Sequence, residues 1–506
     1  MIVTFVRRTL SVCVALAMVV PSGPSWSRET ARSASTEANA TSDPLEWPRF
    51  VLDNPAQFRP GAPPGRRSAT TSRELRELRR LQDARTKSVR RRVRFWNAGA
   101  PTIPWTKVAL DMMVAHRPRP PFAARGLAML HSAMYDAYIA ARDTRRAYDR
   151  VAPSKLDSRI RPLLDVSGST YVPEQAAIAG AAEVVLQEVF PNQRPGTFEE
   201  LATEAVESRL HAGVNYRSDV RRGRALGRAV GNLYLVRAEA DGHTNSGPAH
   251  PRPEGEQYWS PTPPRFEPLT GGPVGTWLPW VMTSPDEART RSQLPGPYSY
   301  GSPQFMAELD EVLDVQANLS PQEQEIAIFW DDGPGSFTPP GHWNAIALDL
   351  LASHPLSSAE TVRLFGLLNV ALADAAIANF EAKYFWWSIR PITAARRLCD
   401  GDTRLCTVAE LEADPSRADH PTWLSDIETP PFPSYPGGHS TFSGASGRVL
   451  EAFFPSADGV IDEQANEAAM SRLFGGIHFR SDNDAGLTLG RTVAQMVLDW
   501  SQGLRD

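Results

Sequence analysis

Apolar residues recur at helical spacing over most of the chain. In the segment 123–142, for example, Leu127, Leu130 and Met134 stand three or four positions apart, which is the spacing of one helix face. Stretches with the alternating pattern of a β-strand are scarce. The pattern predicts an all-α fold of packed helical bundles. The segments with helical spacing are 123–142, 173–190, 198–212, 221–240, 305–315, 321–330, 343–353, 358–385, 440–454, 462–474 and 484–500.

The N-terminus has the layout of a secretory signal peptide. Two arginines precede the apolar stretch Thr9–Val20, and a segment with small residues follows. The apolar stretch is shorter than the roughly 20 residues that cross a bilayer. We expect residues 1–27 to be a signal peptide and the mature protein to be secreted or extracytoplasmic, without membrane association. A later apolar segment, 364–380, is interrupted by Asn369 and Asp374.

Residues 28–104 are predicted to form a flexible, partly basic N-terminal segment before one helical domain over 105–506. The part up to residue 70 is rich in Ser, Thr, Ala and Pro, which is typical of a flexible lead-in. The chain carries a net charge of −5, yet its first 100 residues hold 18 Lys and Arg against 8 Asp and Glu. Because no nucleic-acid-binding motif accompanies the Arg-rich run 72–94, we interpret it as a solvated helix on an acidic body.

Two further features concern loops. Cys399 and Cys406 flank a short polar sequence, and Cys13 lies in the leader. A disulfide between Cys399 and Cys406 suits an exported protein, and two free thiols are the alternative. The segment 241–300 is dense in Pro and Gly and is expected to be a long surface excursion that is folded over the body or flanks a cleft, and a lid is one interpretation of it.

The first motif places two cations around an aromatic block near the end of the longest predicted helix. It reads Lys383-Tyr-Phe-Trp-Trp-Ser-Ile-Arg390-Pro391. Seven residues make nearly two helical turns, so Lys383 and Arg390 would share one face, and Pro391 would end the helix. Two cations on one face can clamp a compact anion, whereas the alternative is a solvated helix face.

The second motif is a proline-rich turn with two glycines before a helix. It reads Pro430-Pro-Phe-Pro-Ser-Tyr-Pro-Gly-Gly-His439-Ser, and small residues follow over 441–447. Amide N–H groups at the start of such a helix would point at an anion, with His439 at the rim. The alternative is an ordinary helix cap or turn.

The third motif reads Ser-Arg472-Leu-Phe-Gly475-Gly476-Ile-His478-Phe-Arg-Ser-Asp482. Arg472 and His478 would lie on different sides of a continuous helix, so the two glycines should break it and let both side chains reach one pocket. If a helix resumes, Asp482 can take the Nδ1 proton of His478 and leave Nε2 free as ligand or nucleophile. A satisfied buried histidine is the alternative.

The three motifs follow one another within one hundred residues, and together they resemble the vanadium-dependent haloperoxidases of the superfamily that also contains the acid and lipid phosphatases. The resemblance implies vanadate as cofactor, with phosphate able to occupy the same site. It implies oxidation of bromide, chloride or both by hydrogen peroxide to a hypohalous species that halogenates a small organic acceptor. Because no nucleic-acid-binding motif is present, we expect no nucleic-acid partner.

The same resemblance assigns roles to individual residues. His478 would coordinate vanadium, and Asp482 would orient it. His439 would be the acid–base group, Lys383 would polarise the bound peroxide, and Asp332 would pair with Arg472. Phe380 and Phe432 would line the halide site. The residues implied to hold vanadate are Lys383, Arg390, Gly437, Gly438, His439, Arg472 and His478.

One position departs from the family pattern. Where the family has Pro-Ser-Gly-His, this chain has Pro-Gly437-Gly438-His439, so one hydroxyl donor is missing. Loss of a donor to a bound anion can cost about 1.5–3 kcal/mol, so a serine at position 437 should tighten binding unless water or Ser440 replaces it. Two alternatives therefore stay open: a phosphatase of the superfamily with His478 as nucleophile, and a non-catalytic oxyanion-binding protein.

Overall fold

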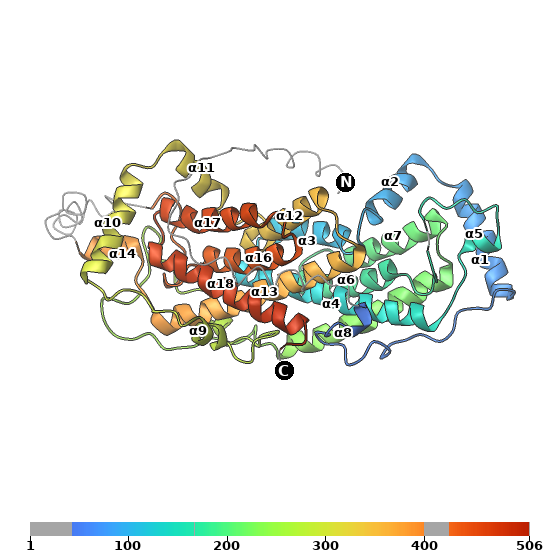
Figure 1. The fold of residues 1–506 in the computed structure, drawn as a ribbon, viewed down its shortest axis with the longest axis horizontal. Coiled ribbons are helices and arrows are strands. Elements are labelled where there is room, and N and C mark those ends of the chain that lie inside the picture. Colours follow the sequence, from blue (N-terminus) through green and yellow to red (C-terminus); the bar gives the residue numbers. More distant parts are fainter. Residues whose placement is uncertain (1–42, 166, 399–424, 505–506) are drawn as a thin grey trace. The chain divides into compact units, whose positions relative to one another are not determined.

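The computed structural model describes residues 43–165, 167–398 and 425–504, and within these ranges every regular element is a helix (Figure 1). The all-α prediction is confirmed, and each segment with helical spacing overlaps a helix. The leader, Cys399 and Cys406 lie outside the described residues. The elements are η2 (Pro44–Glu46), α1 (Ala69–Asp83), α2 (Lys87–Trp96), α3 (Ile103–His116), α4 (Pro120–Ala147), α5 (Pro153–Leu156), α6 (Glu174–Val189), α7 (Thr197–Ala212), α8 (Arg217–Ala240), η3 (Gly272–Thr276), α9 (Glu287–Ser292), α10 (Pro303–Ala317), α11 (Pro321–Phe329), α12 (Thr338–Ser353), α13 (Ser358–Trp386), α14 (Pro391–Arg397), α16 (Gly438–Phe453), α17 (Asp458–Phe474) and α18 (Arg480–Ser501).

The helices form two bundles with separate apolar cores. The first core is shared by α3, α4, α6, α7 and α8, and the second by α12, α13, α16, α17 and α18. In each bundle two helices approach so closely that only glycine fits. A Cβ on Gly227 of α8 would lie 1.8 Å from the Ala177 carbonyl oxygen of α6, and a Cβ on Gly490 of α18 would lie 2.1 Å from the Thr441 carbonyl oxygen of α16. The central helices α4 and α13 pack against each other and join the bundles.

A buried aspartate anchors a loop in the same way in both bundles. Asp136 of α4 accepts hydrogen bonds from three consecutive backbone N–H groups over 50–52, at 3.2, 2.9 and 3.0 Å. Asp374 of α13 accepts three from residues 280–282, at 2.7, 2.9 and 3.2 Å. Both side chains are fully buried. Each bundle thus fixes the chain that crosses its central helix by satisfying backbone donors with one carboxylate.

The described part of the basic N-terminal segment is packed, which differs from the expected flexible lead-in. Trp47, Leu52 and Trp96 are buried in the first core, and Asp136 holds the backbone beside Leu52. The Arg-rich run forms two helices, α1 and α2, that rest on α7. The expected domain boundary at residue 105 falls inside α3. Local composition does not predict this packing of the N-terminal segment, because the groups that hold the segment, such as Asp136, lie on helices far along the chain.

Helix α13 is long and apolar enough to cross a membrane by length and composition, but its apolar window is 100% buried inside the protein. Asn369 in this window exchanges hydrogen bonds with Asn344 of α12. The hydropathy of α13 is therefore that of a core helix. It is the helix around which the second bundle is built.

The Pro-rich excursion 241–300 folds over the C-terminal end of α13. The Trp259 N–H donates to the Trp387 carbonyl at 2.8 Å, and the Thr270 N–H donates to the Pro431 carbonyl at 3.0 Å. The Tyr384 hydroxyl donates to the Thr270 carbonyl at 2.6 Å. The excursion is therefore folded over the body at this end of α13.

Replacing the anchoring carboxylate tests the architecture of the second bundle. Asp374→Ala leaves three buried N–H groups without an acceptor, so we expect the free energy of unfolding to fall by about 3 kcal/mol or more. Asp83→Ala, at an exposed position at the end of α1, is the control and should be near neutral. Urea unfolding followed by circular dichroism measures both. A loss below about 0.5 kcal/mol for Asp374→Ala would contradict the anchoring role.

Candidate functional site

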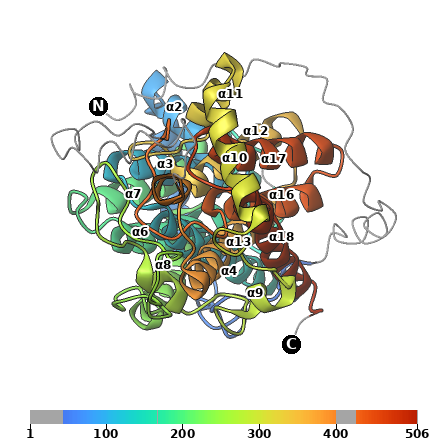
Figure 2. The same ribbon diagram turned by 90° about the vertical axis from the view of Figure 1, so that its left-hand side faces the viewer.

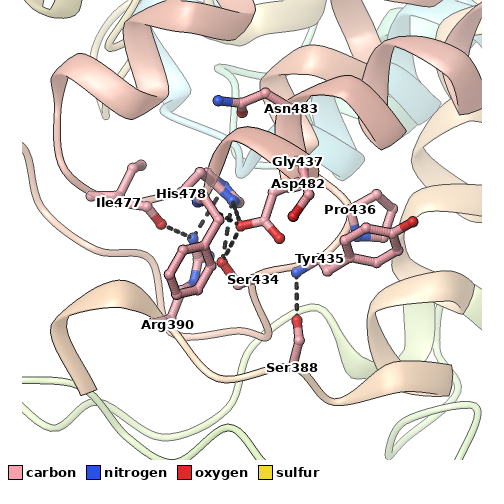
Figure 3. A network of polar contacts seen from close by, with 12 residues as sticks. Ser388, Arg390, Ser434, Tyr435, Pro436, Gly437, Ile477, His478, Asp482 and Asn483 are labelled. Carbon is pink, nitrogen blue, oxygen red and sulfur yellow. Dashed lines mark hydrogen bonds and ion pairs between the residues drawn. The ribbon is translucent and has the colours of Figure 1, made fainter. Parts of the chain in front are cut away.

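The predicted site residues converge where α13, α16, α17 and α18 meet. The Arg390 Nη1 lies 3.1 Å from the His478 Nε2, and the Arg472 Nη1 lies 3.5 Å from the His439 Nε2. Burial, then the charge of Arg390, then that of Lys383 lower the pKa of His478. The three sequence motifs therefore build one site, part of which Figure 3 shows.

The first motif reaches the site by a turn that the sequence did not predict. Helix α13 ends at Trp386, and Trp387 adopts a left-handed conformation with φ of 52°. Arg390 is extended, and Pro391 begins the short helix α14 instead of ending α13. Lys383 and Arg390 thus do not share a helix face. The turn at Trp387 redirects the chain so that both side chains are buried in the same site.

Ser388 joins this turn to the second motif. The Ser434 N–H donates to the Ser388 carbonyl at 3.1 Å, and the Tyr435 N–H donates to the Ser388 Oγ at 2.6 Å (Figure 3). These bonds fix the proline-rich loop against the end of α13.

The Lys383 ammonium is enclosed by the second motif. It is fully buried and donates to the carbonyls of Pro433, Ser434 and Pro436 at 2.8, 2.7 and 2.7 Å. Burial and the neighbouring Arg390 hold the pKa of Lys383 well below its usual range. Three carbonyl acceptors nevertheless require the three N–H donors of the ammonium form. Lys383 therefore shapes the loop directly and acts on the site through its charge.

Arg390 links the second and third motifs. Its Nε donates to the Phe432 carbonyl at 2.9 Å, and its Nη1 donates to the Ile477 carbonyl at 2.8 Å besides facing the His478 Nε2. Burial lowers the pKa of Arg390 to about 10, so the guanidinium stays charged at neutral pH.

The two predicted halide-site aromatics stand together beside the cations. The ring centroids of Phe380 and Phe432 are 5.3 Å apart. The Phe432 ring lies 5.2 Å from the Lys383 Nζ and 5.1 Å from the Arg390 Cζ. Gly271 of the excursion packs against Phe380, since a Cβ at Gly271 would lie 2.1 Å from that ring. The aromatic pair forms an apolar side of the site under the excursion.

The second motif ends at the start of α16. Gly437 is the N-cap and Gly438 the first helical residue. First-turn N–H groups have no acceptor within their own helix, and the helix dipole makes this end attractive to anions. His439 follows, with its Nε2 3.3 Å from the Asp331 carbonyl oxygen. Burial and the nearby Arg472 hold the pKa of His439 well below its usual range, so this imidazole is neutral.

The third motif breaks at the two glycines, as predicted. Helix α17 ends at Phe474, Gly476 adopts φ of 73°, and α18 begins at Arg480. Arg472, on the last turn of α17, is almost fully buried and donates through its Nη2 to the Ala327 carbonyl of α11 at 3.1 Å. Helices α10 and α11, which pack against α17, face the viewer in Figure 2.

His478 is oriented by Asp482, again as predicted. The His478 Nδ1 lies 2.9 Å from the Asp482 Oδ2, which also accepts from the Phe479 N–H at 3.0 Å. Burial raises the pKa of Asp482 to about 6, so the carboxylate is ionised at neutral pH. Burial and Arg390 lower the pKa of His478 far below its usual value. The neutral imidazole therefore carries its proton on Nδ1 and presents the Nε2 lone pair toward Arg390.

The expected pairing of Asp332 with Arg472 is not found. Asp332 instead lies 3.1 Å from the Nδ1 of His342, and Asp331 is the carboxylate near Arg472, with its Oδ1 3.9 Å from the Nη1. Asp332 follows the end of α11 in a left-handed conformation with φ of 48°. This turn points the second aspartate of the pair toward α12, so the assignment was wrong by one residue.

Three site residues were not singled out from the sequence. The Ser434 Oγ donates to the Asp482 Oδ2 at 2.5 Å. The Asn379 Nδ2 donates to the Pro436 carbonyl at 3.2 Å and to the Thr441 Oγ1 at 2.9 Å. Asn379 stands four residues before Lys383, a spacing that could have revealed it. The third residue is Asn483, which lies beside Gly437 (Figure 3).

The site holds more buried positive than negative charge. Lys383, Arg390 and Arg472 are each at most 1% exposed, and Asp482 is the fully buried carboxylate among them. Two further carboxylates act on Arg472: Asp331 is 48% exposed at its side chain, and Asp332, at 6%, is buried against His342. Buried charge without a partner costs several kcal/mol per ion, so a bound anion would relieve the imbalance. Among the described residues no cluster of three His, Cys, Asp or Glu could hold a metal cation.

Comparison with known proteins agrees with this geometry. Residues 363–461 and 459–506 match the family model of the VCPO second helical-bundle domain. The vanadium chloroperoxidase of Curvularia inaequalis is 25% identical over 431 residues, which are 69% of this chain and 65% of that protein. The chain thus spans just under two thirds of this relative's length.

Two solved structures share the fold. A bacterial vanadium-dependent iodoperoxidase aligns with a TM-score of 0.59 and 24% identity over 78% of this chain and 95% of that chain. A holo-type bacterial vanadium-dependent chloroperoxidase aligns with a TM-score of 0.52 and 15% identity over 76% of this chain and 91% of that chain. The chain therefore shares the fold of these vanadium-dependent peroxidases, and the sequence of its second helical bundle is similar to the second helical-bundle domain of that family.

Proposed function

We propose that the protein is a vanadium-dependent haloperoxidase that uses hydrogen peroxide to oxidise bromide, chloride or both, and that it acts outside the cytoplasm. The observation that carries the proposal is the excess of buried positive charge around the Nε2 lone pair of the buried His478. A compact oxyanion of a metal, with one coordination position free for an imidazole nitrogen, would fit this arrangement. The relatives, which are named for vanadium and halide oxidation, support the same reading.

The donor set fits vanadate. His478 would be its single protein ligand, and Arg390 and Arg472 would neutralise its oxygens from two sides, together with the Gly438 N–H at the start of α16. Lys383, whose three donors are taken by carbonyls, would contribute its charge through the loop it holds. When bound, vanadate would supply Lewis-acid activation of hydrogen peroxide toward attack by halide.

The remaining residues handle the proton and the halide. His439 is neutral because burial and Arg472 lower its pKa, so it can accept a proton from hydrogen peroxide as a general base. Its Nε2 lies between the Asp331 carbonyl and Arg472, which fixes the ring at the rim. Phe380 and Phe432 exclude water beside Arg390, where a large and weakly hydrated anion such as bromide is accommodated.

A phosphatase of the same superfamily is the second candidate. The Nδ1 of His478 is held by Asp482, so its Nε2 would also suit nucleophilic attack on phosphorus, and the same cations would hold a phosphoryl group. A non-catalytic oxyanion-binding protein is the third candidate, because the buried cations alone would be enough to bind an oxyanion.

One assay separates these functions and tests His478. Protein loaded with orthovanadate should brominate a dye in the presence of peroxide and bromide, and it should leave a chromogenic phosphate ester intact. His478→Ala should lose at least a hundredfold in bromination rate because the metal loses its only protein ligand. His354→Ala, on an exposed residue after α12, is the control.

Three results would count against the proposal. Cleavage of the ester without bromination would identify a phosphatase. Binding of vanadate with neither activity would identify an oxyanion-binding protein. A full bromination rate in His478→Ala would show that His478 is not the vanadium ligand.

The state of His439 gives a pH prediction. Because burial and Arg472 lower its pKa, the vanadate-free protein should keep His439 neutral at pH 6, below the ordinary histidine pKa of about 6.5. Added orthovanadate brings negative charge and should raise the pH at which His439 protonates. Ring-carbon NMR with labelled histidine, assigned with His439→Gln, measures both states. An ordinary pKa in the vanadate-free protein would contradict the described environment.

A further inference from the structure

The corner of the site at Gly437 is crowded. A Cβ at Gly437 would lie 2.9 Å from the Ser440 Oγ, 3.1 Å from the Asn483 Oδ1 and 3.1 Å from the Asp482 carbonyl oxygen. The space beside the glycine is thus filled by polar groups of α16 and α18. This argues against a gain in anion binding from a serine at position 437 alone, because that serine would have to shift Ser440 and Asn483.

Asn483 brings a buried and unpaired donor to this corner. The residue is 1% exposed, and its Oδ1 accepts a hydrogen bond from the Ser440 Oγ at 3.0 Å. With the oxygen held by Ser440, the Nδ2 points away from that hydroxyl. This Nδ2 is buried and has no hydrogen-bond partner among the described residues. A buried N–H without an acceptor costs about 1–3 kcal/mol.

The position of Asn483 couples it to the imidazole. It follows Asp482 in the first turn of α18, and the Asp482 carbonyl accepts from the Gly437 N–H at 2.7 Å. In Figure 3 Asn483 lies near Gly437, above the pair formed by His478 and Asp482. Asn483 therefore lies close to the start of α16 and is adjacent in sequence to the aspartate that orients His478.

We propose that the Asn483 carboxamide donates a hydrogen bond through its Nδ2 to an oxygen of the bound tetrahedral oxyanion, in the place of a side-chain hydroxyl at position 437. Ser440 is a positioning residue that holds the Oδ1 and thereby orients the donor. The inference rests on the proposed function, since it assumes that an oxyanion occupies the site. It assigns the missing donor to a residue on α18, and Gly437 favours this arrangement because any side chain there would crowd the carboxamide.

Calorimetric titration of the full chain with orthovanadate, and separately with inorganic phosphate, tests this assignment. Asn483→Ala should weaken both anions about tenfold, the usual effect of one lost donor. Asn483→Asp should weaken them further, because a carboxylate repels the anion. Asn466→Ala, at an exposed position on α17, is the matched control and should bind as the unmodified chain does.

A double variant separates a donor from a space-filling residue. Gly437→Ser alone should bring no gain, because its side chain meets Ser440 and Asn483. Gly437→Ser combined with Asn483→Ala should recover most of the tenfold loss of Asn483→Ala, since the new hydroxyl enters the vacated space. The two substitutions are therefore expected to be strongly non-additive.

Thermal unfolding without anion shows whether each variant folds. If Asn483→Ala is unfolded, Asn483→Leu keeps the branched shape without the donor and should show the same tenfold loss. Unchanged affinity of a folded Asn483 variant, while the unmodified chain binds vanadate, would overturn the inference and leave the proposed function standing. No binding of either anion by the unmodified chain would overturn the proposed function and the inference with it.

Discussion

The structure depends on burying positive charge that the protein does not neutralise itself. Lys383 and Arg390 donate their hydrogen bonds to backbone carbonyls, mostly of the second motif, and not to carboxylates. Proline is well suited to this task because it offers a carbonyl acceptor, has no N–H to compete, and holds a fixed φ. The carbonyls of Pro433 and Pro436 both accept from Lys383. The proline-rich loop thus acts as a rigid solvation shell for the cations. Because its carbonyls carry no net charge, the positive charge of the cations remains available to a bound anion.

The second bundle keeps this arrangement in place. Asp374 fixes the chain that crosses α13, and the contact at Gly490 draws α16 and α18 together. The same approach brings the Gly437 N–H to the Asp482 carbonyl, so the anion-facing end of one helix and the orienting carboxylate of the other are held by a direct backbone bond. Groups that must be aligned within tenths of an ångström are therefore carried by helix ends in a packed core and not by free loops.

The sequence predicts the parts of the site that are governed by local geometry. The helix break at Gly476 and the four-residue spacing of His478 and Asp482 follow from helical periodicity. It does not predict contacts whose partners are backbone groups elsewhere in the chain, such as the three carbonyls on Lys383 or the three N–H groups on Asp374, because backbone acceptors and donors leave no trace in residue type. Which of the two neighbouring aspartates lies near Arg472 could not be predicted for a related reason. It depends on the left-handed backbone conformation of one residue, Asp332.

Charged and neutral donors at such a site are constrained differently. A buried cation needs a cage of acceptors built around it, so Lys383, Arg390 and Arg472 depend on several segments at once and cannot move without rebuilding them. A neutral donor needs only a position within hydrogen-bond distance and one contact to orient it. Exchange of a hydroxyl at position 437 for a carboxamide from α18 is therefore compatible with an unchanged set of cations. Sequence variation within an oxyanion site of this kind should therefore be concentrated at its neutral donors. Exchanging a neutral donor does not change the net charge that binds the anion.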